Sequence, residues 1–111
     1  MKLMIAGSRS IPAFDLSPYI SKDVDCIITG GAEGIDQIAE QYADDHRLSK
    51  IILRPQYGLY KRNAPLIRNR QMVDIADAVL VIWDGKSKGT RHTMEYAQKK
   101  GVPLQVINAN D

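Results

Sequence analysis

Cysteine and histidine are scarce in this sequence of 111 residues, and their scarcity excludes several kinds of site. Cys26 is the only cysteine, so no disulfide can form within the chain, and its apolar neighbours indicate a core thiol rather than a nucleophile. The only histidines, His46 and His92, stand far apart and show no zinc-ligand spacing, so we expect neither a metal nor a cofactor. Ser8 has no His–Asp pair that could be assigned to it, which argues against a serine hydrolase.

Strong charge of one sign and long apolar runs are also lacking. The 15 lysine and arginine residues nearly balance the 13 aspartate and glutamate residues, and a net charge of +2 is too small for a strong general affinity for nucleic acid or an anionic membrane. Any anion site must therefore come from local clustering. No apolar run approaches the ~20 residues of a membrane span, and no basic and apolar leader precedes the first strand. We therefore predict a cytoplasmic protein without a membrane partner.

Short apolar runs alternate along the chain with segments of helical pattern. The clearest helix begins at Ile35, where apolar residues recur at i, i+3, i+4, i+7 and i+8. The apolar runs are continuous, which is typical of parallel strands buried on both faces. We predict a single α/β domain over residues 1–111: a five-stranded parallel sheet in the order 3-2-1-4-5, with helices on both faces. The predicted strands are residues 2–6, 25–29, 50–53, 78–83 and 104–107.

Two further helices are predicted at residues 64–76 and 90–100, with a weakly helical segment at 11–21 and a fraying tail at 108–111. Asn63 is expected to cap the first of these helices, and Gly101 to end the second. The predicted core combines apolar residues of the strands and helices: Leu3, Ile5, Ile27, Ile28, Ile38, Ala39, Ile51, Ile52, Val79, Val81, Ile82, Met94 and Val106.

Glycine and charged residues gather in the segments that follow the predicted strands. Because ligands of an open parallel sheet bind beyond the carboxyl ends of its strands, these segments predict one pocket. Glycines let a ligand approach the backbone, arginines bind phosphate, and a helix N-terminus attracts anions. We predict a binding site for a phosphate-bearing ligand, formed by Gly7, Ser8, Arg9, Gly30, Gly31, Ala32, Asp36, Arg68, Asn69, Asp84, Lys88, Gly89 and Thr90.

Within this site, Arg9 and Arg68 are expected to donate charge-assisted hydrogen bonds to a phosphate. The helix that opens at Gly89-Thr90 should point its N-terminus at a phosphate. Asp36 and Asp84 are candidates for ribose hydroxyls, because a carboxylate beside a phosphate would repel it.

Several of these features have a structural alternative. The glycine-rich segment 30–34 lacks the full dinucleotide fingerprint and the Lys-Ser/Thr of a phosphate loop, so it can also be a plain turn. The segment 84–89 can likewise be a simple strand–helix connection. Arg9 can be a solvated charge, Asp36 can favour the dipole at a helix start, and Asn69 can bond the backbone rather than a ligand.

Four segments resemble the small SLOG-superfamily domains related to YspA and YpsA, in the same order and over nearly the whole chain. They are Ile5-Ala6-Gly7-Ser8-Arg9, Thr29-Gly30-Gly31-Ala32-Glu33-Gly34-Ile35-Asp36, Arg68-Asn69-Arg70-Gln71-Met72-Val73, and Trp83-Asp84-Gly85 followed by Gly89-Thr90. The resemblance implies a Rossmann-like fold that binds nucleotides or nucleotide-derived ligands such as ADP-ribose-type molecules. It also implies a distant relation to the LOG phosphoribohydrolases and to the Smf DNA-processing proteins.

The sequence departs from the LOG enzymes at their catalytic position. Those enzymes use a Glu three residues after the Thr of a Pro-Gly-Gly-x-Gly-Thr-x-x-Glu motif, and Thr93 stands there in this chain. Glu95, two residues further on, would lie about 200° around a helix from that position. A Thr hydroxyl cannot replace a carboxylate that stabilises an oxocarbenium-like centre, so we assign no catalytic residue.

These observations favour a module that senses or sequesters a nucleotide-derived small molecule, either an ADP-ribose-type or a nucleoside phosphate ligand. The resemblance also leads us to expect a homo-oligomer. The alternative is a hydrolase of nucleotide N-glycosidic bonds that uses Asp36, Asp84 or Glu95 in place of the missing Glu. Nucleic acid is considered an unlikely partner, because the net charge is low and no strand face combines aromatic and basic residues.

Overall fold

Five parallel strands form the centre of the computed structural model, which describes residues 1–109. The strands are β1 (Lys2–Gly7), β2 (Cys26–Thr29), β3 (Ser49–Ile52), β4 (Ala78–Trp83) and β5 (Leu104–Asn108). The helices are α1 (Ile35–Asp45), α2 (Tyr57–Tyr60), α3 (Ala64–Ile75) and α4 (Lys88–Lys100), with short 3-10 turns η1 (Ser17–Tyr19) and η2 (Lys61–Asn63). The α/β class and the five strands predicted from the sequence are confirmed.

β1 lies in the middle of the sheet, whose order is β3-β2-β1-β4-β5 with every neighbouring pair parallel. In this register Met4 of β1 pairs with Ile28 of β2 on one side and with Val79 of β4 on the other. The predicted strand order is therefore confirmed. Because all strands are parallel, their carboxyl ends share one edge of the sheet, and each loop that leaves this edge starts from the same side of the molecule.

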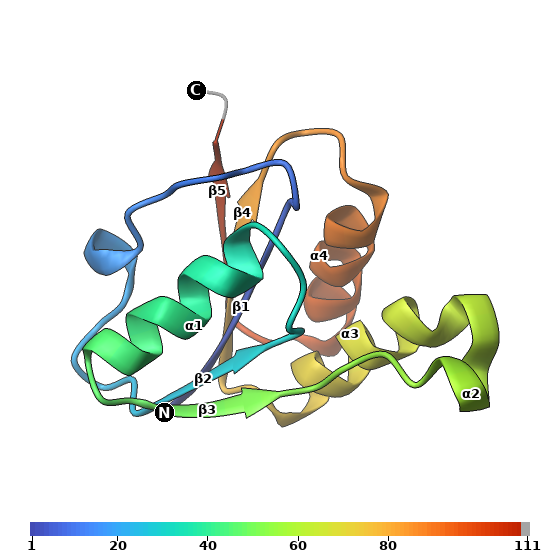
Figure 1. Cartoon of the computed structure of the whole chain (residues 1–111), viewed down its shortest axis with the longest axis horizontal. Coiled ribbons are helices and arrows are strands. Elements are labelled where there is room, and N and C mark those ends of the chain that lie inside the picture. The colour runs from blue at the N-terminus through green and yellow to red at the C-terminus, as the bar shows by residue number, and fades with distance from the viewer. Residues whose placement is uncertain (110–111) are drawn as a thin grey trace.

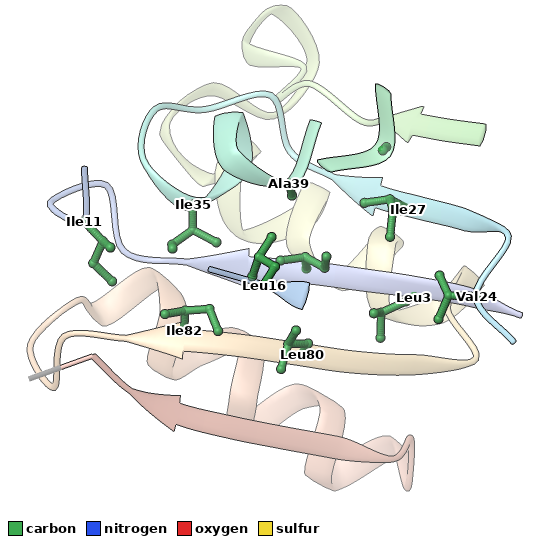
Figure 2. Close-up of a cluster of buried hydrophobic side chains, with 11 residues drawn as sticks. Leu3, Ile11, Leu16, Val24, Ile27, Ile35, Ala39, Leu80 and Ile82 are labelled. Carbon is green, nitrogen blue, oxygen red and sulfur yellow. The ribbon is translucent and has the colours of Figure 1, made fainter. Parts of the chain in front are cut away.

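α1 covers one face of the sheet, as Figure 1 shows. Its residues Ile35, Ala39 and Ala43 are four apart, so they share one side of the helix, and all three are buried. They pack on a cluster drawn from β1, β2 and β4, with further side chains from the loop before β2 (Figure 2). The strand members of this cluster are Leu3, Ile5, Ile27, Leu80 and Ile82.

α3 and α4 cover the opposite face. Met72 and Val73 of α3 and Ala97 of α4 are buried against the alternate residues of the same strands, which are Met4, Ala6, Ile28, Val79 and Val81. The ends of α4 are well defined, because the Ser87 hydroxyl accepts a hydrogen bond from the Thr90 amide and Gly101 ends the helix in a left-handed conformation with φ 74°. The prediction of helices on both faces is confirmed.

Five residues of the predicted core are exposed or only partly buried. Val106 is 38% exposed because β5 is an edge strand, and Ile38, Ile51, Ile52 and Met94 are only partly buried. The remaining predicted core residues are buried, as is the thiol of Cys26, whose pKa is raised by that burial.

The connections also differ in detail from the prediction. The segment 11–21 forms only the turn η1, yet Ile11 and Leu16 from this segment are buried in the cluster under α1. Asn63 precedes α3, but its side chain makes no capping hydrogen bond. Of the predicted tail, Asn108 completes β5, and residues 110–111 lie outside the described part of the chain. Within residues 1–109, no helix combines the length and the apolar character needed to cross a membrane.

Gly7 ends the central strand where there is no room for a side chain, and this generates a stability prediction. A Cβ atom at this position would lie 2.5 Å from Cγ1 of Ile35 and 2.6 Å from the Ile82 carbonyl oxygen. We expect Gly7→Ala to lower the free energy of unfolding by about 1–3 kcal/mol, as overpacking does. Gly58 of α2 has open space around it, so Gly58→Ala should leave stability unchanged or slightly raised. Urea denaturation of both variants measures the difference, and equal stabilities would contradict this account.

Candidate functional site

Two open cavities adjoin at the carboxyl edge of the sheet and share Arg9, Ala32 and Arg68 in their walls. Each has a volume of about 450 Å³. The first cavity lies between the end of β1 and the helices α3 and α4. The second lies between the loop that leads into α1 and the segment that joins β3 to α2. Together we call them the edge groove.

Close packing of two loops places Arg9 between the cavities. A Cβ atom added to Gly34 would lie 2.7 Å from the Ser8 carbonyl oxygen and 2.8 Å from Cα of Arg9, so the loop after β1 rests directly on the loop before α1. Ser8 itself is buried and accepts a hydrogen bond at its Oγ from the Asp84 amide, 3.0 Å away. Arg9 is exposed and lines both cavities. The backbone is therefore fixed while the Arg9 side chain faces the groove.

Arg68 is a buried cation that joins the ends of two strands. Its Nη1 donates to the carbonyl oxygens of Gly30, 2.7 Å away, and Leu53, 3.2 Å away, and its Nε donates to Oδ1 of Asn69 at 2.8 Å. Only 6% of the residue is exposed. Burial lowers the pKa of Arg68, and the nearby carboxylate of Asp36 opposes that shift. Most of the donor capacity of this guanidinium is thus used within the protein.

Asp36 lines the first cavity from the first turn of α1 and is 8% exposed. Its Oδ2 accepts a hydrogen bond from the Ala32 amide at 3.1 Å. Burial raises the pKa of Asp36, while the Ala32 amide and the charge of Arg68 act in the opposite direction. The carboxylate therefore stabilises the turn at residues 32–36 and is poorly solvated.

Asp84 organises the loop that joins β4 to α4. Its Oδ1 accepts hydrogen bonds from the amides of Lys86, at 2.8 Å, and Ser87, at 2.9 Å, and its Oδ2 accepts one from Oγ of Ser10 at 2.9 Å. These bonds hold the pKa of Asp84 well below its usual range. Both carboxylate oxygens accept hydrogen bonds from loop residues, so Asp84 fixes the shape of the β4–α4 loop in the wall of the first cavity.

The start of α4 forms the far wall of the first cavity. Gly89, Thr90 and Thr93 line it, and the Thr93 hydroxyl donates to the Gly89 carbonyl oxygen at 3.2 Å. Thr93 therefore does face the cavity at the position where LOG enzymes have their Glu. Glu95 is exposed and pairs with Arg91 at 3.0 Å, which confirms that it points elsewhere.

The structure brings together most of the predicted site residues. Eleven of them line one or both cavities: Gly7, Arg9, Gly30, Gly31, Ala32, Asp36, Arg68, Asn69, Asp84, Gly89 and Thr90. Ser8 and Lys88 are not among the lining residues, since Ser8 is buried beneath the loop and Lys88 is exposed at the start of α4.

Arg54 and Tyr57 were missing from the predicted site. Both line the second cavity, beside Gly31 and Glu33. The rule that selected the other loops would have found Arg54, because it follows the third strand at the same sheet edge. Among residues 1–109, no three His, Cys, Asp or Glu side chains are grouped in a way that could hold a metal ion.

The fold and the groove define a class, an α/β domain of Rossmann-like architecture with a polar groove at the carboxyl edge of its sheet. No family model matches the sequence. The Gene 61 protein of Mycobacterium phage D29 is 36% identical over 91 residues, in a match that covers 77% of this chain and 71% of the phage protein. The chain belongs to the family of this phage protein.

A solved structure shares the whole fold. DNA processing protein A from Helicobacter pylori matches with a TM-score of 0.75 and 24% sequence identity, over 100% of this chain and 67% of that chain. The structural study of that protein concerns its single-stranded DNA binding mode. The Rossmann-like fold expected from the sequence is confirmed, and so is the relation in fold to DNA-processing proteins.

This match corrects the prediction of function and partner. The expected role was the sensing or sequestration of a nucleotide-derived small molecule, with nucleic acid as an unlikely partner, whereas the protein that shares the fold is described by its binding of single-stranded DNA. The prediction about nucleic acid was wrong because it relied on the low net charge, which averages over the whole surface, and on the lack of a strand face that combines aromatic and basic residues. Arg9, Arg54 and Arg68 instead meet around one cavity.

Burial of Asp36 generates a pH prediction. A carboxyl group whose pKa is raised in the folded protein stabilises the folded state most below its ordinary pKa of 3.8. This contribution to stability is lost as the pH rises through the pKa of the group in the folded protein. Asp36→Asn is neutral at all pH values and can still accept the Ala32 hydrogen bond. We therefore expect its free energy of unfolding to increase relative to the parent as the pH rises from 3.8 toward 7. Urea denaturation at several pH values tests this, and a difference independent of pH would refute it.

The bonds of Arg68 generate a second prediction. Arg68→Met keeps much of the volume but leaves the Gly30 and Leu53 carbonyl oxygens without this donor, so the free energy of unfolding should fall by about 2–4 kcal/mol. Arg70→Met, on the exposed side of the same helix, should change it by less than about 1 kcal/mol. Chemical denaturation compares the two variants. Similar effects would show that Arg68 is not a structural cation.

Proposed function

We propose that this protein binds single-stranded DNA along the edge groove. The observation that carries the proposal is the meeting of three arginines, Arg9, Arg54 and Arg68, around an open cavity at the sheet edge. The likeness in fold to a single-stranded DNA-binding protein supports it. Binding of single strands without sequence preference requires a cationic groove that follows the sugar-phosphate backbone, and this groove has that character.

The charges of the two cavities differ, and this difference favours the second cavity as the place where the phosphates of the strand bind. The second cavity has three arginines against one carboxylate, that of Glu33. In the first cavity, Arg9 and Arg68 are balanced by the carboxylates of Asp36 and Asp84. A polyanion therefore gains most in the second cavity, where Arg9 and Arg54 have the more accessible guanidinium groups.

The rest of the predicted site fits this proposal as the wall of the groove. Gly30 and Gly31 leave room for the guanidinium groups of Arg68 and Arg54, whose Nη1 atoms would lie 2.6 and 2.7 Å from a Cβ atom added at these positions. The start of α4 at Gly89-Thr90 offers a positive helix end to the neighbouring part of the strand. The exposed cations Lys61 and Arg62 follow directly after α2, whose first residue Tyr57 lines the second cavity.

Three finer expectations belong with this proposal. The first is membership of the small SLOG-type domains related to YspA and YpsA, which the sequence motifs support. The predicted cytoplasmic location remains a prediction, as does the predicted homo-oligomer.

Arg9 gives the direct test of this function. We expect Arg9→Ala to weaken binding of a fluorescent oligothymidylate by about tenfold, because an ionised donor to phosphate is lost. It should also reduce the slope of log affinity against log salt concentration by about 0.7, the value for one phosphate contact on a single strand. Fluorescence anisotropy across a salt series measures both quantities.

Lys22→Ala is the matched control, since it removes one exposed positive charge just before β2, at the opposite edge of the sheet. Its affinity and salt slope should equal those of the parent. Failure of the parent protein to bind the oligothymidylate, or equal effects of the two substitutions, would contradict binding in this groove. Tighter binding of RNA or duplex DNA by the parent would instead reassign the nucleic acid.

A further inference from the structure

Tyr57 stands at the mouth of the second cavity with its ring uncovered. It is the first residue of α2, which Figure 1 shows extending outward from the sheet and the other helices. The side chain lines the cavity and is 55% exposed. In residues 1–109 the ring–ring contacts are Phe14 with Tyr19 and Tyr42 with His46, so no protein ring stacks on Tyr57.

The backbone around Tyr57 is fixed although its side chain is exposed. Pro55 restricts the connection from β3, and the Gln56 carbonyl oxygen accepts hydrogen bonds from the amides of Leu59, at 3.1 Å, and Tyr60, at 3.0 Å. These bonds close the turn of α2. Little conformational entropy would thus be lost from the backbone when a ligand covers the ring.

Arg54 lies on the same side of the cavity and is tied to the opposite loop. Its Nη1 donates to the Gly31 carbonyl oxygen at 3.3 Å, which places a cation beside the floor of the cavity. Arg68 lines the same cavity as Tyr57. The ring and the cations therefore border one space, with room for a base and its phosphate together.

The first cavity offers no such surface. Its apolar lining residues are Ala6, Ala32, Pro65 and Met72, and it has no aromatic side chain. A base that enters the first cavity cannot stack on a protein ring, whereas a base in the second cavity can stack on Tyr57. The two halves of the edge groove therefore differ in what they can do with a nucleobase.

We infer that Tyr57 is a base-stacking platform, so that one nucleobase of a bound single strand lies on its ring while the adjacent phosphates contact Arg9 and Arg54. The inference rests on the proposed function and adds to it a subsite for one nucleobase within the edge groove. Stacking on an aromatic ring contributes to binding for every base, so this subsite selects nucleotides with bases over a bare sugar-phosphate chain.

A comparison of two probes tests the inference. One probe is an oligothymidylate of about eight nucleotides, a length within the site sizes of single-strand-binding folds, and the other is an abasic strand of the same length and charge. Tyr57→Ala should weaken oligothymidylate binding by about 5- to 150-fold, the range for loss of one base–aromatic stack. Binding of the abasic strand should stay nearly unchanged. Tyr57→Phe should behave like the parent, because it keeps the ring and loses only the hydroxyl.

Leu59→Ala is the matched control, because Leu59 is 66% exposed on the same helix and does not line the cavity. It should affect neither probe, and Arg9→Ala should weaken both probes alike. If Tyr57→Ala weakens both probes equally or neither, the platform is refuted while binding that depends on Arg9 still supports the proposed function. If the parent binds neither probe, the proposed function fails together with the platform.

Discussion

A buried guanidinium holds together the edge of the sheet on which the groove is built. β2 and β3 end at different loops, and Arg68 bonds the Gly30 carbonyl oxygen of one and the Leu53 carbonyl oxygen of the other. A carbonyl oxygen left without a partner at a buried strand end would cost about 1–3 kcal/mol. Asp36 partly offsets the cost of burying this cation. The wall between the two cavities, and hence the division of the groove, depends on this arrangement.

The ionisable residues of the groove fall into two groups according to their bonds. Arg68, Asp36 and Asp84 make hydrogen bonds within the protein, chiefly to the backbone, and hold the loops in place. Arg9 and Arg54 are exposed and line the second cavity, so their guanidinium groups are accessible to a ligand. Residue identity alone does not separate these groups, because the same amino acid, arginine, can either support a loop or contact a phosphate.

The sequence predicted the fold more fully than the site. Continuous apolar strands alternating with helices were sufficient for the parallel order, because burial on both faces leaves few other arrangements. Val106 was misplaced in the core because its apolar character does not reveal an edge strand. Most of the site followed from the rule that strand ends converge. The same rule reaches Tyr57, which follows the third strand, but nothing in the sequence ranks it above its neighbours, since its exposure beside a cavity is a property of the folded surface.

The strand order β3-β2-β1-β4-β5 has a consequence for how such a protein can change during evolution. From the central strand β1 the chain continues to one side and later returns on the other, so α1 and α4 are carried to opposite faces and leave a crevice between their starts. The crevice thus arises from connectivity rather than from any one side chain. Relatives can exchange the residues of the loops, and with them the ligand, while the recess itself is inherited unchanged with the topology.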